Sequence, residues 1–198
     1  MNKQTIITIF LALLALTATA QEIKMNEASI NDYLPLLKAK GYFVYSFDTK
    51  DFKDALVTPV IMEYVKGEEP RDALGFDWTV SMGEKLLIGF APSDNDSTVV
   101  FTIQITESIH MDSRLLLKPI DVPGKPEKHD YKYEPRPFKL EAPFEKGKFI
   151  PLVLYGSYWY EAETGAYRFC GDSSIKSDLS SDILKETPHF YVLGIKIK

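Results

Sequence analysis

Residues 99–106 read VVFTIQIT, and this octapeptide carries the clearest structural signal in the chain. Apolar and mostly polar positions alternate along it, with Val99, Phe101, Ile103 and Ile105 in one set and Val100, Thr102, Gln104 and Thr106 in the other. Successive side chains of an extended chain point to opposite faces, so this alternation predicts a strand with one apolar face.

Clusters of turn-forming residues separate this strand from its neighbours. Residues 91–97 (APSDNDS) form one such turn, and Gly83-Glu84 is a further turn between residues 76–82 and 85–90. The segments around them have strand composition, namely residues 42–48, 57–65, 76–82, 85–90 and 114–120. Pro59 restricts the strand at 57–65 to a sheet edge or to a start at that proline.

Helical signals near the start of the chain are short. A helix is expected over residues 29–41, where Ser29 or Asp32 caps the free N–H groups and Gly41 ends the element. Residues 49–55 predict a single helical turn.

The last third of the chain returns to strands. One is expected at residues 149–156, and residues 158–161 and 167–170 are expected to pair as a hairpin. A short helix is expected at 177–186. In residues 190–198 apolar side chains alternate with Lys196 and Lys198, and outward lysines predict a strand at a sheet edge.

Residues 119–143 differ from the rest of the chain in composition. They hold six of the twelve prolines, which are Pro119, Pro123, Pro126, Pro135, Pro137 and Pro143. Proline lacks the N–H that a sheet ladder needs, so we expect extended irregular chain here and not central sheet. A long loop across one end of the domain is favoured over an interdomain linker, because composition is alike on both sides.

The first residues have the organisation of a secretory signal peptide. Lys3 gives a basic start, residues 6–16 (IITIFLALLAL) are apolar, and small residues precede Gln21. This pattern predicts cleavage between Ala20 and Gln21 and a periplasmic or extracellular protein. The apolar run is shorter than the ~20 residues that a membrane span requires. No cysteine stands at the cleavage point, so we expect no lipid anchor, and because no second apolar run of membrane length follows, we expect no membrane span.

These elements predict a mostly β fold, a single antiparallel β-sandwich of the jelly-roll type over residues 21–198 with one short N-terminal helix. The chain carries a net charge of −5, so it has no electrostatic reason to bind nucleic acid. Cys170 is the only cysteine, which excludes an intramolecular disulfide; a buried thiol is favoured over a reactive one.

No catalytic or metal-binding signature is present. A G-x-S-x-G elbow is missing, and the spacing of His110, His129 and His189 favours neither a catalytic triad nor zinc. The run at residues 94–96 (DND) has calcium-type oxygen ligands, but ordinary turn chemistry is favoured there. Acidic pairs drawn from Glu141, Glu145, Glu161 and Glu163 are nonspecific. We therefore predict no catalytic residue, no metal and no cofactor.

The aromatic residues of the expected hairpin form the one candidate binding site. Residues 155–169 read YGSYWYEAETGAYRF, and the candidate ligand-binding residues are Tyr158, Trp159, Tyr160 and Tyr167. Exposed aromatic rings suit the apolar faces of sugars or a protein partner. The alternative is that all of these rings are buried in the core or covered by the proline-rich loop.

The two ends of the chain resemble small exported proteins of unknown function from Gram-negative gut bacteria. The resemblance lies in the leader ending in Ala-Thr-Ala-Gln and in residues 187–194 (TPHFYVLG), and it brings no functional residue with it. The function expected is that of a non-catalytic exported binding module, with a glycan as the ligand of the hairpin aromatics. An envelope protein-assembly component is the alternative, followed by a small periplasmic hydrolase.

Overall fold

The computed structural model describes residues 34, 37–124, 130–141, 144–169 and 175–198. The chain divides into two units, Met1–Pro35 and Leu36–Lys198, and Leu34 is the one described residue of the first. The expected signal peptide and Cys170 lie outside the described residues. Most of the expected helix at 29–41 does as well, although Leu34 and residues 37–39 are helical.

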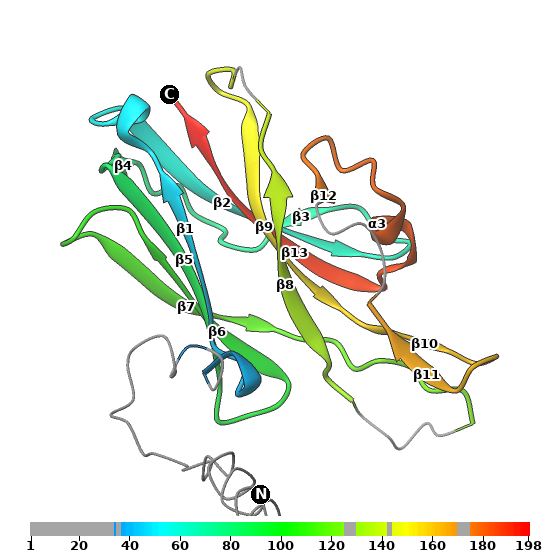
Figure 1. Cartoon of the computed structure of the whole chain (residues 1–198). Helices are drawn as coiled ribbons and strands as arrows, with labels where there is room; N and C mark the ends of the chain where they lie inside the picture. Colours follow the sequence, from blue (N-terminus) through cyan, green and yellow to red (C-terminus); the bar gives the residue numbers. More distant parts are fainter. Residues whose placement is uncertain (1–33, 35–36, 125–129, 142–143, 170–174) are drawn as a thin grey trace, which may run out of the picture. The chain divides into compact units, whose positions relative to one another are not determined.

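One sheet of the second unit has four antiparallel strands in the order β1-β5-β6-β7 (Figure 1). Its strands are β1 (Phe43–Asp48), β5 (Lys85–Pro92), β6 (Thr98–Gln104) and β7 (His110–Leu116). β6 is the strand that the alternation at residues 99–106 predicts, and its burial alternates residue by residue as expected. β5, β6 and β7 follow one another in the chain and are joined by short turns, whereas β1 pairs with β5 across the segment that holds β2 to β4.

The other sheet has seven strands, six of them in the order β12-β8-β9-β13-β2-β3, with β4 also paired to β2. Its strands are β2 (Leu56–Val65), β3 (Arg71–Asp72), β4 (Val80–Ser81), β8 (Tyr133–Lys139), β9 (Phe149–Ser157), β12 (Ile175–Lys176) and β13 (His189–Ile197). All of its pairs are antiparallel except β12 with β8.

Three smaller elements complete the described part of the chain. β10 (Trp159–Glu161) and β11 (Ala166–Arg168) pair as the expected hairpin, which extends beyond the seven-stranded sheet in Figure 1. The expected helical turn is η1 (Lys50–Phe52), and the expected helix at 177–186 shortens to α3 (Asp182–Glu186). None of the described helices has both the length and the apolar character that crossing a membrane demands. The prediction of a mostly β fold with short helices is confirmed.

The two sheets share one apolar core. Alternate side chains of β5 and β6 meet alternate side chains of β2, β9 and β13, and Phe90 stacks on Tyr155 with ring centroids 4.7 Å apart. The Tyr45 hydroxyl also reaches across and donates a 3.0 Å hydrogen bond to the Pro135 carbonyl oxygen. Burial of apolar surface at about 25 cal/mol per Å² makes this shared core the main source of stability.

A second apolar cluster lies on the opposite face of the seven-stranded sheet. It brings together side chains of β8, β9 and β13 with those of β12 and α3, and its buried members are Phe138, Leu154, Phe169, Ile175, Ile183, Phe190 and Val192. The middle strands of this sheet are therefore covered on both faces, unlike β6, and they read as continuous apolar runs for that reason.

The prediction that the C-terminal strand lies at a sheet edge is wrong. β13 pairs with β2 along residues 189–197 and with β9 on its other side, so it is a central strand. Its run FYVLGI is buried on both faces, and of the two lysines only Lys196 belongs to the strand, where it is exposed.

The prediction for the proline-rich segment is wrong in part, because residues 133–139 form β8. β8 pairs antiparallel with β9 through residues 133–137, while β12 pairs only with Phe138 and Lys139. Pro135 and Pro137 share one phase of the strand, so both missing N–H groups face the side on which no described strand pairs with them. Pro59 of β2 likewise lies between the residues that pair with β3 and those that pair with β4.

The strand expected at residues 76–82 is also shorter than predicted. Only Val80 and Ser81 pair, with Val57 and Leu56 of β2. Phe76 stays exposed, whereas Trp78 and Val80 pack against the core shared by the two sheets and Met82 is buried in it, so the apolar side chains of this segment reach the core with little strand pairing.

A glycine in β13 allows the two central strands to approach closely, and its replacement should unfold this region. A Cβ at Gly194 would lie 2.1 Å from the Ile150 carbonyl oxygen, where the register of β9 shifts. We expect Gly194→Ala to lower the free energy of unfolding by about 3 kcal/mol or more, because backbone must move.

Gly89 of β5 is the matched control, since a Cβ there would meet its nearest atom at 3.7 Å. Gly89→Ala should change the free energy of unfolding by less than about 1 kcal/mol. Urea denaturation of both variants measures the difference, and equal effects would contradict the close approach at Gly194.

Candidate functional site

The hairpin β10–β11 divides the four predicted binding residues between different surroundings. Its register places Tyr160 opposite Tyr167, and Trp159 opposite Arg168 on the other face. The rings of Tyr160 and Tyr167 are half-buried and stand edge to face, with centroids 5.5 Å apart. These two residues are the pair that the hairpin presents together.

Polar groups surround the Tyr160–Tyr167 pair. The Lys132 ammonium lies 3.9 Å from the centre of the Tyr167 ring, and the Tyr167 hydroxyl donates to the Asp130 carboxylate. Aromatic rings beside a cation and a carboxylate offer both an apolar face and hydrogen-bonding groups to a ligand.

Tyr158 and Trp159 pack against the second apolar cluster instead. The Tyr158 ring stacks on Phe169 at 5.0 Å, and its hydroxyl donates a 2.7 Å hydrogen bond to Glu134. The structure therefore does not gather all four predicted residues on one surface. Tyr158 and Trp159 hold the hairpin to the domain, whereas Tyr160 and Tyr167 contact each other.

A polar cluster that the sequence analysis did not single out occupies one end of the inner sheet face. Glu63 follows Val57 and Ile61 in the same phase of β2, and His189 precedes Leu193 in the same phase of β13. Both side chains are therefore directed toward the space between the sheets. The Glu63 side chain is 5% exposed and that of His189 is 2% exposed.

Cross-strand pairing brings partners to the buried carboxylate. Arg71 of β3 and Tyr191 of β13 both lie directly opposite Glu63 in the register. Side chains at such positions have Cβ atoms about 5 Å apart and interact. Arg71 Nε donates to Glu63 Oε2 at 2.5 Å, and His189 Nε2 lies 3.0 Å from Glu63 Oε1.

The hydrogen bonds continue from His189 into the core. Because ionised Glu63 only accepts, His189 Nε2 carries the proton, and Nδ1 of the neutral ring accepts from the Tyr133 hydroxyl at 2.5 Å. The Tyr133 oxygen in turn accepts the Lys118 N–H at 3.0 Å. Tyr133, His189, Glu63 and Arg71 thus form one chain of hydrogen bonds from the core to the surface.

This chain perturbs the acid–base properties of its members. Burial by itself raises the pKa of Glu63, and the bonds from Arg71 and His189 outweigh it, so the pKa lies below its ordinary value. Burial lowers the pKa of His189 and the Glu63 carboxylate opposes this, with a lowered value as the result. Burial raises the pKa of Tyr133 and Tyr191. At neutral pH the cluster holds Glu63⁻, Arg71⁺ and a neutral His189.

Two tyrosine hydroxyls also tie this cluster to the four-stranded sheet. Tyr191 donates to the Leu116 carbonyl oxygen at the end of β7, at 2.7 Å, and Tyr133 bonds the Lys118 backbone beyond it. The polar cluster therefore links both sheets at this end of the sandwich.

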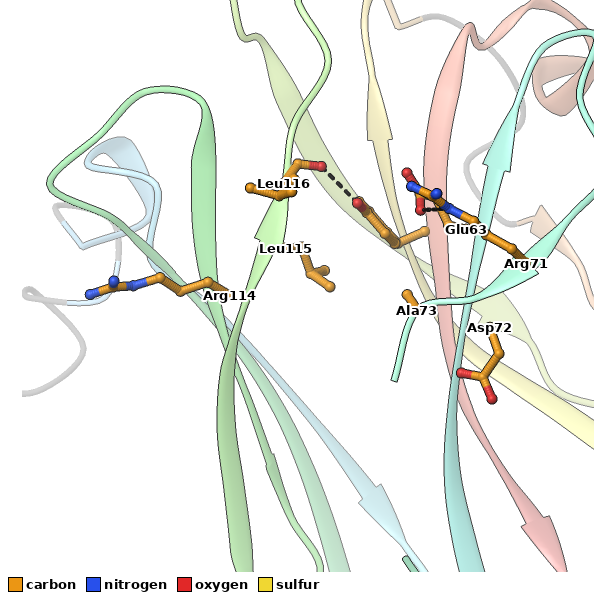
Figure 2. A pocket seen from close by; sticks show the side chains of 8 residues that line it. Glu63, Arg71, Asp72, Ala73, Arg114, Leu115 and Leu116 are labelled. Atoms are coloured by element: carbon orange, nitrogen blue, oxygen red, sulfur yellow. Dashed lines mark hydrogen bonds and ion pairs between the residues drawn. The ribbon is translucent and has the colours of Figure 1, made fainter. Parts of the chain in front are cut away.

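A cavity of about 310 Å³ opens beside the cluster, between β7 of one sheet and β3 of the other (Figure 2). Glu63, Arg71 and Tyr191 supply its polar groups, while Ala73, Leu115 and Leu116 supply apolar wall. In Figure 2, Arg71 extends toward Glu63, whereas Arg114 at the rim extends away from the other lining side chains.

Other groups considered in the sequence have local roles. Asn95 Oδ1 accepts from the backbone N–H and the hydroxyl of Ser97, which is the turn chemistry favoured for residues 94–96. Glu161 pairs with Arg168 at 2.5 Å across the hairpin. His110 is exposed and His129 lies outside the described residues. Among the described residues, no three His, Cys, Asp or Glu side chains gather in a way that would hold a metal ion.

His189 does not have the surroundings of a hydrolase histidine. Both ring nitrogens are engaged, by Tyr133 and by Glu63, and the nearby Ser157 hydroxyl accepts from the His189 backbone N–H. This geometry gives no support to a nucleophile activated by His189.

By its fold and its polar cluster, the protein is a two-sheet β-sandwich with a buried Glu–His pair beside a small cavity. Residues 75–198 match the model of DUF5041, a domain of unknown function, and the chain belongs to this family. No curated protein and no solved structure matches the chain. The matched range includes Tyr133, His189 and the hairpin, while Glu63 and Arg71 precede it.

Acid should destabilise the protein through His189. As pH falls through about 6.5, the unfolded chain takes up a proton at this histidine, whereas the folded chain with its lowered pKa does not. Since the unfolded state then binds more protons, the free energy of unfolding falls between pH 7.5 and 5.

We expect His189→Gln to reduce this pH dependence and His110→Gln, at an exposed site, to retain it. Urea midpoints at pH 7.5 and 5 measure the effect, and NMR titration of the wild-type His189 ring gives its pKa directly. A His189 that titrates above 6.5 in the folded protein would contradict the assignment.

Proposed function

We propose that this protein is an exported, non-catalytic binding module that takes a carbohydrate on the hairpin β10–β11. The observation that carries the proposal is the Tyr160–Tyr167 pair, whose rings keep exposed surface on a hairpin that pairs with no other described strand. A two-stranded hairpin in water is marginal on its own, and Tyr158 and Trp159 anchor this one to the domain.

The chemistry beside the pair suits a sugar. Sugar rings have apolar faces that pack on aromatic side chains, and their hydroxyls bond to charged groups such as Asp130 and Lys132. The T-shaped arrangement of the two rings gives a stepped surface of large rigid area. Binding of this kind requires no chemistry at the ligand.

The signal-peptide pattern of residues 1–20 supports the same proposal, because an exported protein of Gram-negative gut bacteria, the group that the two ends of the chain resemble, meets glycans outside the cytoplasm. The leader should be removed between Ala20 and Gln21. We expect the protein isolated from the periplasm or medium of a Gram-negative host to begin at Gln21. N-terminal sequencing checks this, and a chain that keeps residues 1–20 would contradict export by this route.

The binding site is tested by replacing one ring of the pair. After a glycan array identifies a ligand, Tyr160→Ala should weaken its binding at least about tenfold in calorimetry, equivalent to about 1.4 kcal/mol. Tyr42→Ala removes an exposed tyrosine outside the hairpin and is the matched control. A broad array without any bound glycan, or equal losses in both variants, would contradict the proposal.

An envelope-protein partner is the second candidate, and the edge strand β7 favours it. Among the described strands β7 pairs with β6 alone, so its other edge is open to an added strand. Crosslinking in cells separates the candidates. A partner captured equally by wild type and Tyr160→Ala would favour assembly over glycan binding.

A further inference from the structure

We infer that the cavity between β3 and β7 is a second binding site, which takes the carboxylate group of a small ligand on Arg71. This site lies apart from the hairpin, and the inference does not rest on the proposed glycan binding. It rests on the hydrogen-bond chain that ends at Arg71 and on the space next to that arginine.

Arg71 has hydrogen-bond donors that no described residue uses. Of the five N–H groups of its guanidinium, Nε–H bonds Glu63, and the Nη groups have no partner among the residues that the structure describes. Two parallel N–H groups of an arginine match the two oxygens of a carboxylate, which is the strongest and most geometrically specific pairing available to it.

Arg71 is also held in position. Its side chain is 67% exposed, and a long exposed side chain ordinarily samples many rotamers. Here the carboxylate that orients it is itself fixed by His189 and, through His189, by Tyr133. Burial of an ion is costly, and a simple surface ion pair does not require it. The buried chain of hydrogen bonds from Tyr133 through His189 to Glu63 is explained if its role is to fix the direction of the Arg71 side chain.

The cavity supplies room for the body of the ligand. Its volume of about 310 Å³ lies at the lower end of the range of small-molecule sites. Leu115, Leu116 and Ala73 provide apolar wall, and Tyr191 and Glu63 provide polar groups. A uronic acid or a short peptide with its terminal carboxylate has the required chemistry, and both are natural probes.

The charge balance limits what binds. Glu63 is already neutralised by Arg71 and bonded by His189, and Asp72 is engaged with the Leu74 backbone N–H at 2.8 Å. A ligand carboxylate therefore meets unused donors of Arg71 without displacing Glu63. A neutral sugar would leave those donors unpaired and should bind more weakly.

The test is a titration of the full processed chain, followed by NMR, with galacturonic acid, the dipeptide alanyl-alanine and neutral galactose. We expect at least one of the two acids to bind and to shift Arg71 and Tyr191 signals, with galactose at least tenfold weaker. Binding of galacturonic acid alone identifies an acidic sugar, and binding of the dipeptide alone identifies a peptide terminus. Binding of neither acid, or equal binding of galactose, overturns the inference.

Variants separate the site from general charge effects. Arg71→Gln should weaken binding at least tenfold, and Arg71→Lys should weaken it several-fold while its ammonium still pairs with Glu63. Arg114→Gln removes the same charge from the same rim, but its guanidinium extends away from the cavity, so affinity should be unchanged (Figure 2). Equal losses in Arg71→Gln and Arg114→Gln overturn the inference.

A further variant leaves all charges in place, so it tests the site even if the arginine variants fail to fold. Ala73→Leu adds side-chain volume at the cavity wall without touching the Ala73 N–H bond to Ile61. It should abolish binding of the acid while the melting temperature stays near that of wild type. Tyr160→Ala should retain the acid binding, which keeps failure here distinct from failure of the hairpin site.

Discussion

The buried carboxylate of Glu63 is the constraint on which the polar end of the sandwich depends. An ionised carboxylate leaves water only when hydrogen-bond donors and a counter-charge replace the lost hydration. These partners are Arg71 of β3, which stands opposite Glu63 in the register, and His189 of β13, which lies two residues before Tyr191, the residue opposite Glu63 on that strand. A slip of one residue between β2 and β13 would turn Glu63 away from His189. The buried Glu63 carboxylate therefore depends on this register and, because other registers would leave it without His189, also helps to specify it.

The same strands show why the seven-stranded sheet tolerates so little polar surface. β13 lies between β2 and β9 and is covered by the shared core on one face and by the cluster around Ile183 on the other. Buried polar side chains of this sheet have hydrogen-bond partners, as Glu63 and His189 do in the hydrogen-bond chain and Thr58 does with Thr79. Among the described residues, no buried side-chain nitrogen or oxygen is left without a hydrogen bond. In β13, the buried polar side chain of His189 therefore lies at one end of the strand, where hydrogen bonds satisfy it.

Local composition and periodicity in the sequence predicted most of the long strands, but neither β8 nor the position of each strand within its sheet. The alternation at residues 99–106 predicted β6, aromatic and β-branched composition predicted β1, and the turn residues 163–165 (ETG) predicted the hairpin. Whether a strand lies at the edge or the centre of its sheet depends on pairing with distant parts of the chain. For this reason Lys196 led to the wrong prediction of an edge position for β13, and Pro135 led to the wrong prediction of irregular chain at β8. The polar cluster was equally hidden, because Glu63 and His189 are 126 positions apart. An acid in phase with Val57 and Ile61 signals a buried partner without identifying it.

The candidate sites differ in how their geometry is maintained, and this bears on what each can recognise. The hairpin aromatics are held by ring contacts such as Tyr158 on Phe169 and by hydrogen bonds from Tyr158 to Glu134 and from Tyr167 to Asp130. Arg71 is held by directional bonds that reach Tyr133 in the core. Preorganised donors lose less entropy on binding and reject ligands that leave them unpaired. Under the two proposals, the hairpin would offer aromatic ring faces to a sugar, and the cavity would select a ligand by one charged group.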